Sequence, residues 1–201
     1  MLPAPVVKRP KARPGEIIAE RHDAASVVFA DLVGFTAISG RADPDSLVRW
    51  LDTVFAAFDG LAAQHGLTKI KTAGDAFIAV AGVPEARADH AAAAARFALD
   101  LGRAVARLRT PYGDPVALRI GVAGGRVIAG VVGKTRFFYD VWGDTVNVAA
   151  RLQGVGEPGR VLIDAATQAA LGEAFGTEAR GAIALQGKGM VEAWRLDAAP
   201  P

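Results

Sequence analysis

The order in which short apolar runs and longer amphipathic segments alternate between residues 26 and 122 constrains the fold most strongly. Runs typical of buried strands alternate with segments whose apolar residues recur three and four positions apart, the spacing of one helix face. In chain order we predict strand 26–31, helix 43–65, strands 68–72 and 76–80, helix 89–109 and strand 116–122. This β-α-β-β-α-β order is the ferredoxin-like unit, whose helices pack on one face of an antiparallel sheet.

The sequence also marks where these elements end. Asp43 or Asp45 is expected to cap the first helix, and Gly66 to follow its last residue. The Ala-Gly-Asp run at residues 73–75 predicts a hairpin turn between the two middle strands. A polar loop is predicted over residues 35–43, between the first strand and the first helix.

The rest of the chain predicts a C-terminal α/β extension and two flanking segments. Its expected elements are strands 126–132 and 136–141, a helix capped by Asp144, strand 160–163, helix 165–171 and strand 193–196. Residues 1–24 are expected to be a flexible leader with a short helix over 16–21, residues 25–197 the folded domain, and residues 198–201 a tail. The predicted fold class is therefore α+β, with a palm-like ferredoxin core and this extension.

Composition limits the kinds of site the chain can hold. There is no Cys, and the three His residues lack zinc-ligand spacing, so any metal should be hard and bound by oxygen. The net charge of +2 is too small to predict nucleic-acid binding. No apolar run is long enough to cross a membrane, and no signal peptide is evident. We therefore predict a cytoplasmic domain, or one at the cytoplasmic face of a membrane if it was cut from a larger protein.

Four basic residues lie among the prolines of the predicted leader: Lys8, Arg9, Lys11 and Arg13. They are compatible with a solvated tail and also with a polybasic segment close to a membrane. The sequence leaves both interpretations open, together with an upstream membrane or regulatory domain outside this chain.

The ferredoxin-like order should bring two aspartates together. Its first and third strands are antiparallel neighbours, so the end of the first lies beside the start of the third. Asp31 ends the first strand and Asp75 precedes the third, which places both carboxylates at one edge of the sheet. Like charges repel unless a cation lies between them, and Mg²⁺ prefers carboxylate and phosphate oxygens. The alternative is that Asp31 caps a turn and Asp75 is only a hairpin residue.

Glycines beside both aspartates favour a nucleotide site. Gly34 follows Asp31 closely, and the segment Gly34, Phe35 and Thr36 can offer backbone N–H groups to a triphosphate. Two metal ions at such a site would activate a hydroxyl group and stabilise a leaving phosphate. Within one nucleotide, attack of the 3′-hydroxyl on the α-phosphate gives a cyclic nucleotide and pyrophosphate.

Three motifs in this order resemble those of class III adenylate and guanylate cyclases. They are Phe29–Thr36 (FADLVGFT), Lys69–Phe77 (KIKTAGDAF) and Tyr139–Leu152 (YDVWGDTVNVAARL), and the similarity extends from about Ala25 to Leu196. The resemblance implies a homodimer with two sites at its interface. One subunit supplies the metal ligands of a site, and its partner supplies the purine and transition-state residues.

The resemblance also implies roles for single residues. Asp31, Asp75 and the backbone carbonyl of Leu32 match the ligands of two divalent cations, Mg²⁺ or Mn²⁺. Lys71 and Asp140 match the pair that reads the purine. Without the motifs, these two would be interpreted as an exposed strand lysine and a turn acid.

Asn147 and Arg151 match the residues that orient the ribose and stabilise the transition state. They are spaced to share one helix face, which in most proteins is only a solvated surface. One departure concerns the triphosphate. The family often has Val-Lys-Gly-Lys-Gly near the C-terminus, whereas Gln186 replaces the first lysine here, which leaves Lys188 as a candidate phosphate ligand.

Hydrogen-bonding groups favour ATP over GTP. Adenine offers an amino donor to Asp140 and the N1 acceptor to Lys71, whereas guanine has the reverse pattern. A guanylate cyclase resembling this chain would carry Glu at position 71 and usually Cys near position 140. We therefore predict an adenylate cyclase. The alternatives are a guanylate or mixed-purine cyclase, and a silent cyclase-like domain that binds nucleotide or only dimerises.

Overall fold

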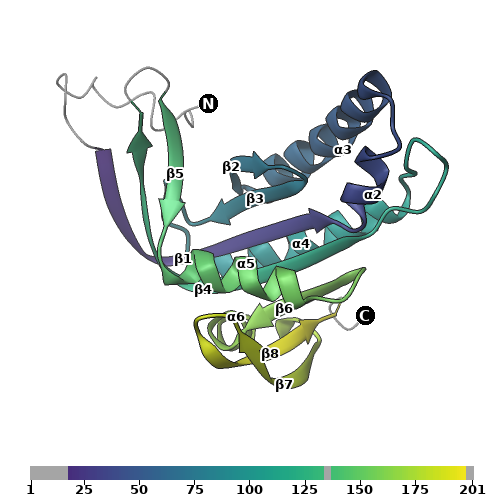
Figure 1. The fold of residues 1–201 in the computed structure, drawn as a ribbon. Helices are drawn as coiled ribbons and strands as arrows, with labels where there is room; N and C mark the ends of the chain where they lie inside the picture. The colour runs from purple at the N-terminus through teal and green to yellow at the C-terminus, as the bar shows by residue number, and fades with distance from the viewer. Residues whose placement is uncertain (1–17, 134–136, 198–201) are drawn as a thin grey trace.

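The computed structural model describes residues 18–133 and 137–197 (Figure 1). Its sheet has the strand order β2-β3-β1-β4-β6-β8-β7, with β5 paired to β4 outside this path. The strands are β1 (Ile18–Leu32), β2 (Thr68–Ala73), β3 (Ala76–Ala81), β4 (Leu118–Val132), β5 (Phe138–Trp142), β6 (Arg160–Asp164), β7 (Thr177–Leu185) and β8 (Gly189–Leu196). The helices are α2 (Phe35–Ser39), α3 (Pro44–His65), α4 (His90–Ala106), α5 (Asp144–Val155) and α6 (Ala165–Leu171), followed by a 3₁₀ turn, Gly172–Ala174.

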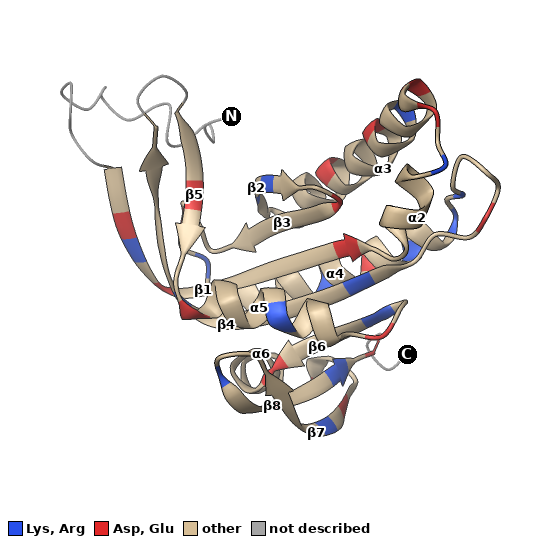
Figure 2. Ribbon diagram, viewed as in Figure 1, with Lys and Arg blue, Asp and Glu red and all other residues tan. Residues whose placement is uncertain are grey.

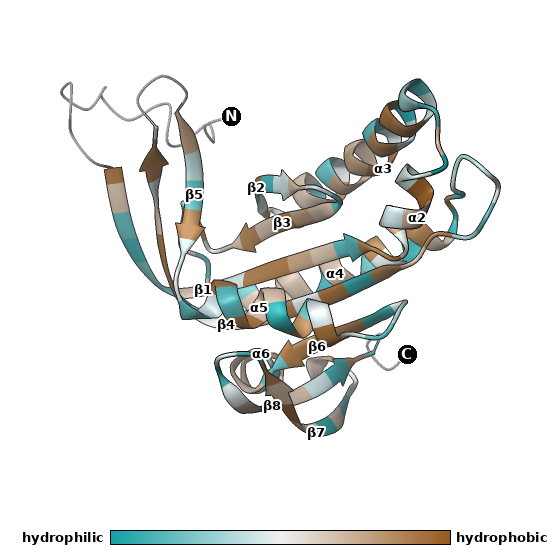
Figure 3. Cartoon of the chain, in the orientation of Figure 1, coloured by the Kyte–Doolittle hydropathy of each residue, from teal (hydrophilic) through white to brown (hydrophobic). Residues whose placement is uncertain are grey.

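The predicted ferredoxin-like unit is confirmed. Strands β2, β3, β1 and β4 are neighbours in this order, and each adjacent pair is antiparallel. Helices α3 and α4 cover one face of the sheet, and α5 lies on the other (Figure 1). Val28 of β1 packs into the core under α3 and α4, whereas Val27 packs into a second core with α5. Because both faces of β1 are buried, its centre is a continuous apolar run between charged ends (Figure 2, Figure 3).

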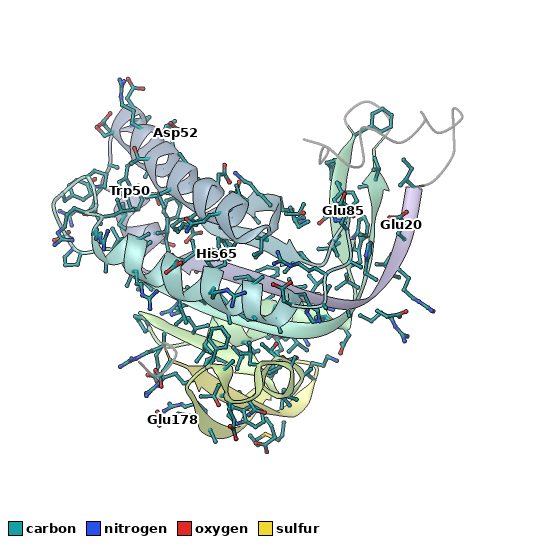
Figure 4. The ribbon with its side chains drawn as sticks, turned by 180° about the vertical axis from the view of Figure 1, so that it is seen from behind. Glu20, Trp50, Asp52, His65, Glu85 and Glu178 are labelled. Atoms are coloured by element: carbon teal, nitrogen blue, oxygen red, sulfur yellow. The ribbon has the colours of Figure 1, made fainter. Side chains whose placement is uncertain are left out.

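The ends of α3 follow the predicted signals. The Asp43 carboxylate accepts hydrogen bonds from the backbone N–H groups of Asp45 and Ser46 at 3.1 and 3.2 Å. At the other end, Gly66 adopts a left-handed conformation with φ 67°. Trp50 on this helix (Figure 4) packs against the core, and its Nε1 donates a hydrogen bond to the carbonyl of Arg109 at 2.8 Å.

The predicted leader is wrong from Ile18 onward. No helix forms over residues 18–21, because Ile18 to His22 pair with β4 as the first part of β1, before a bulge that ends at Ala25. Likewise, β4 is one strand rather than the two predicted. Gly124 and Gly125 interrupt the apolar pattern of β4 because helices pack closely there. A Cβ at Gly124 would lie 3.2 Å from the hydroxyl oxygen of Thr167 on α6, and one at Gly125 would lie 2.8 Å from that of Thr145 on α5. These glycines allow close packing and do not break the strand.

Helix α2 and strand β7 were not predicted from the sequence. Helix α2 lies within the expected polar loop, and the edge strand β7 is mostly exposed and pairs with β8. The predicted cap of α5 is also wrong, since Gly143 holds the cap position and Asp144 is the first helical residue. Within residues 18–133 and 137–197, no helix is long and apolar enough to cross a membrane.

Candidate active site

Asp31 and Asp75 meet at one edge of the sheet, as the strand order predicts. Asp31 lies opposite Ala76 in the pairing of β1 with β3, and Asp75 is the residue before Ala76. Burial raises the pKa of Asp31 to about 6, and both the negative charge of Asp75 and a hydrogen bond with it contribute to this rise. Two like charges this close repel each other, and a divalent cation between them would relieve that repulsion.

The donor groups at this edge fit a hard divalent cation. In the part of the chain that the structure describes, no group of three or more His, Cys, Asp and Glu side chains is placed to hold a metal. The predicted ligands are the two carboxylates and the carbonyl of Leu32, the residue after Asp31 at the end of β1. Mg²⁺ and Mn²⁺ accept such a set when water and phosphate oxygens complete their shells. The assignment of these three residues as metal ligands stays a prediction.

Two further residues contact or face Asp31 and were missed from the sequence. Gln153 of α5 donates a hydrogen bond from Nε2 to Oδ2 of Asp31 at 3.3 Å. Arg119 lies opposite Asp31 in the pairing of β1 with β4. The charge of Arg119 and the hydrogen bond from Gln153 both lower the pKa of Asp31, against the larger effect of burial. Arg119 could have been found, since it stands near the start of the strand antiparallel to the one that Asp31 ends.

The predicted phosphate segment directly follows β1. Gly34 has φ 75°, and its carbonyl accepts hydrogen bonds from the backbone N–H groups of Ala37 and Ile38 at 3.0 and 3.1 Å. Phe35 packs against the core under α3 and α4, while Thr36 is exposed at the start of α2. The structure places this turn next to the carboxylate edge, and its contact with phosphate stays a prediction.

Lys71 and Asp140 form an ion pair that joins β2 to β5. Lys71 Nζ donates a hydrogen bond to Oδ2 of Asp140 at 2.5 Å. The Asp140 side chain is 8% exposed and that of Lys71 is 46% exposed. The aspartate is thus fixed within the fold, whereas the ammonium group is accessible to a ligand.

Asn147 and Arg151 lie on α5, four residues apart, with Asn147 exposed and Arg151 half-buried. The turn between β7 and β8 covers Arg151, since a Cβ at Gly187 would lie 3.5 Å from its Nη2. In the same turn, Lys188 forms an ion pair with Asp144 at the start of α5. The described ion pair of Lys188 is thus with α5 rather than with the Asp31–Asp75 edge.

Comparison with known proteins decides the family. Residues 17–198 match the adenylate and guanylate cyclase catalytic domain. The chain belongs to this family. It is 48% identical over 196 residues to an adenylate cyclase of Mycobacterium tuberculosis. The aligned residues make up 98% of this chain but only 44% of that relative. The cyclase domain thus spans less than half the length of this curated relative.

Solved structures confirm the fold of the cyclase domain. The guanylate cyclase domain of RhGC from Catenaria anguillulae, in complex with GTP, superimposes with a TM-score of 0.87 at 31% identity and covers 90% of this chain and 100% of its own. The adenylyl cyclase CyaB from P. aeruginosa gives a TM-score of 0.85 at 25% identity and covers 90% of this chain and 97% of its own.

A projecting arm of the cyclase domain exposes apolar side chains. The start of β1, the end of β4 and β5 extend together away from the helical layers (Figure 1). Tyr139 and Val141 are buried, whereas the large exposed apolar residues here are Ile128, Val132, Phe137, Phe138 and Trp142. Phe137 and Phe138 are 61% and 48% exposed. Such a patch is typical of a surface that binds another protein.

Proposed function

We propose that this cyclase domain converts ATP into 3′,5′-cyclic AMP and pyrophosphate. The observation that carries the proposal is the Lys71–Asp140 ion pair of 2.5 Å, which presents one donor and one acceptor side by side. Adenine offers the complementary acceptor and donor at N1 and its amino group. The 48% identity to a mycobacterial adenylate cyclase supports the same choice.

The reaction forms a bond from the ribose 3′-oxygen to the α-phosphorus and breaks the bond from that phosphorus to the leaving pyrophosphate. Two divalent cations, when bound, supply the positive charge that activates the 3′-hydroxyl and stabilises the phosphates. Asp31, Asp75 and the Leu32 carbonyl would hold them. Arg119, beside Asp31, is placed to bind phosphate oxygens with its planar fork.

The remaining proposed contacts come from α5 and the turn after β1. Asn147 orients the ribose, and Arg151 stabilises the negative charge that develops in the transition state. Backbone N–H groups of Gly34, Phe35 and Thr36 bind the triphosphate. Lys188 would reach the phosphates only after its ion pair with Asp144 breaks, so we assign it a smaller role in phosphate binding than Arg119.

We further propose that the domain works as a homodimer with ATP at its interface. The apolar arm formed by β4 and β5 supports this, because Phe137, Phe138 and Trp142 are exposed in the single chain. Each site would then take its cations from one subunit and its base and transition-state residues from the other. We place the reaction in the cytoplasm or at the cytoplasmic face of a membrane.

The first alternative is a guanylate or mixed-purine cyclase, which the GTP complex of a structural relative keeps relevant. Lys71 and Asp140 argue against it because they mismatch guanine. The second is a silent domain. The chain retains Asp31, Asp75 and Arg151, and the two aspartates are in contact, which argues against a silent domain.

The test is product formation by the purified chain with ATP or GTP, each with Mg²⁺ or Mn²⁺, over a range of protein concentrations. We expect cyclic AMP and pyrophosphate in equal amounts, a preference for ATP, and specific activity that rises with concentration as dimers form. Asp75→Asn is the matched control and should abolish turnover. Preference for GTP, or binding of ATP and metal without product in a folded dimer, would contradict the proposal.

A further inference from the structure

The side chain of Gln153 reaches from α5 to the carboxylate edge of β1. Its Nε2 donates a hydrogen bond to Oδ2 of Asp31 at 3.3 Å, although the two residues are 122 positions apart. A glutamine amide is neutral. It can therefore hold one carboxylate oxygen without cancelling the negative charge that attracts a cation.

The backbone of Gln153 is fixed against the sheet rather than carried by a loose helix end. A Cβ at Gly121 of β4 would lie 2.3 Å from the carbonyl oxygen of Ala149 and 2.4 Å from the backbone nitrogen of Gln153. The helix backbone therefore rests directly on the strand, which only glycine allows at this position. Gly121 in turn lies opposite Phe29, two residues before Asp31 on β1.

The end of α5 is held close to the same edge of the sheet. Leu152 is fully buried, and a Cβ at Gly156, after the last residue of α5, would lie 3.8 Å from the Cβ of Arg119. Arg119 lies opposite Asp31 in the strand pairing. These two contacts fix the helix backbone from which the Gln153 side chain extends.

We propose that Gln153 is a positioning residue of the metal site, which fixes the Asp31 carboxylate through Oδ2 and leaves its other oxygen for the cation. The inference rests on the proposed function, in which Asp31 and Asp75 hold the divalent ions. Neighbours that orient a metal ligand through a hydrogen bond affect metal affinity without touching the metal. In the proposed dimer, Gln153 acts on the site whose cations its own chain holds.

The first experiment measures Mn²⁺ binding to the full chain by electron paramagnetic resonance, without nucleotide. Gln153→Met keeps the length of the side chain but removes the amide. We expect the dissociation constant for Mn²⁺ to rise about tenfold, in the range typical of such neighbours. Gln64→Met, the same change at an exposed position of α3, is the matched control and should leave it unchanged. Thermal unfolding of each variant checks that the fold is retained.

The outcomes separate this inference from the proposed function. If Asp75→Asn loses Mn²⁺ binding but Gln153→Met binds Mn²⁺ as tightly as the unaltered chain, the role of Gln153 is overturned and the metal site is not. Binding that Asp75→Asn leaves unchanged would overturn the metal site itself and, with it, this inference.

The second experiment places the substitution in one subunit of a mixed dimer. When Asp75→Ala and Arg151→Ala chains pair, the Arg151→Ala chain supplies the cation ligands of the single intact site. Gln153→Met on that chain should raise the Mn²⁺ concentration for half-maximal activity about tenfold, whereas on the Asp75→Ala chain it should have no effect. An equal shift from both placements, or from neither, would contradict local positioning by Gln153.

Discussion

Lys69 and Lys71 are two residues apart in β2, yet their side chains lie on opposite faces of the sheet. Lys69 lies opposite Ala79, which faces the core under α3 and α4, and its Nζ is 2.7 Å from Asp59 of α3. Lys71 lies opposite Ile78, the residue before Ala79, and therefore on the other face. In a regular strand the two lysines would share a face.

A bulge between these lysines explains the difference. Ile70 is the extra residue, and it packs with the core under α5. Bulges near functional sites commonly redirect a side chain. Here the bulge turns Lys71 away from the helical layer and toward Asp140.

The first prediction concerns base selection. Lys71→Glu combined with Asp140→Cys should lower kcat/KM for ATP about a hundredfold and shift the preference toward GTP, because hydrogen bonds to charged groups are worth about 1.5–3 kcal/mol. Steady-state kinetics with both nucleotides measure this. Lys69→Gln, on the opposite face of the same strand, is the control and should leave the ATP/GTP ratio unchanged. Unchanged ATP kinetics in the double variant would remove the specificity argument.

The second prediction ranks two basic residues near the phosphates. Arg119→Ala should lower kcat/KM for ATP by about 10- to 100-fold, because Arg119 lies beside the carboxylate edge. Lys188→Ala should cost at most about fivefold, equivalent to about 1 kcal/mol, since the described ion pair of Lys188 is with Asp144 at the start of α5 rather than with the carboxylate edge. Both are measured at saturating Mn²⁺. The reverse ranking would show that Lys188 replaces the missing family lysine at Gln186.

The third prediction tests the contact between α5 and the sheet. Gly121→Ala should destabilise the fold by about 1–3 kcal/mol or more, because the added methyl group meets helix backbone that cannot yield without moving α5. Gly60→Ala, on α3 with open space around it, should instead stabilise by up to about 1 kcal/mol. Chemical unfolding measures both, and equal effects would show that α5 is not held by this contact.

The fourth prediction concerns acid stability. His65 at the end of α3 (Figure 4) contacts Asp100 of α4 at 2.8 Å, and Arg103 contacts the same carboxylate at 2.7 Å. Burial alone would raise the pKa of Asp100, but the hydrogen bonds from Arg103 and His65 hold it below its usual range. A lowered folded-state pKa contributes stability above the unfolded pKa of about 4, and this stability is lost as the pH falls through the folded value.

Asp100→Asn should therefore lower the free energy of unfolding at pH 7, and its difference from the unaltered chain should shrink below about pH 4. Urea unfolding across this range measures the difference. Asp52→Asn, at an exposed position of α3, is the control and should show no such narrowing. A difference that stays constant with pH would contradict the prediction.

The sequence was sufficient for features that depend on strand order and local signals. The meeting of Asp31 with Asp75 follows from the β-α-β-β-α-β order, and the limits of α3 follow from Asp43 and Gly66. These features require only periodicity, caps and topology.

Features that depend on how the helices and strands pack against one another could not be predicted from the sequence. The contact of Gln153 with Asp31 requires α5 to rest on Gly121, and one sequence gives no measure of that distance. The face of Lys71 depends on a bulge whose extra residue, Ile70, is an ordinary strand former. In the edge strand β7, the exposed Ala182 and Ala184 alternate with Ile183 and Leu185, so apolar residues lie on both faces. Its sequence therefore lacks the polar–apolar alternation that identifies a half-buried strand.

Complementation between two inactive variants tests the shared, metal-dependent site most directly. Asp75→Ala lacks a proposed cation ligand and Arg151→Ala lacks the proposed transition-state residue, so each purified alone should form no cyclic AMP. In an equal mixture half of the dimers are mixed and carry one intact site of two, so activity should return to about a quarter of the unaltered level. No recovery at any mixing ratio, in samples where subunit exchange is demonstrated, would contradict a site built from both subunits.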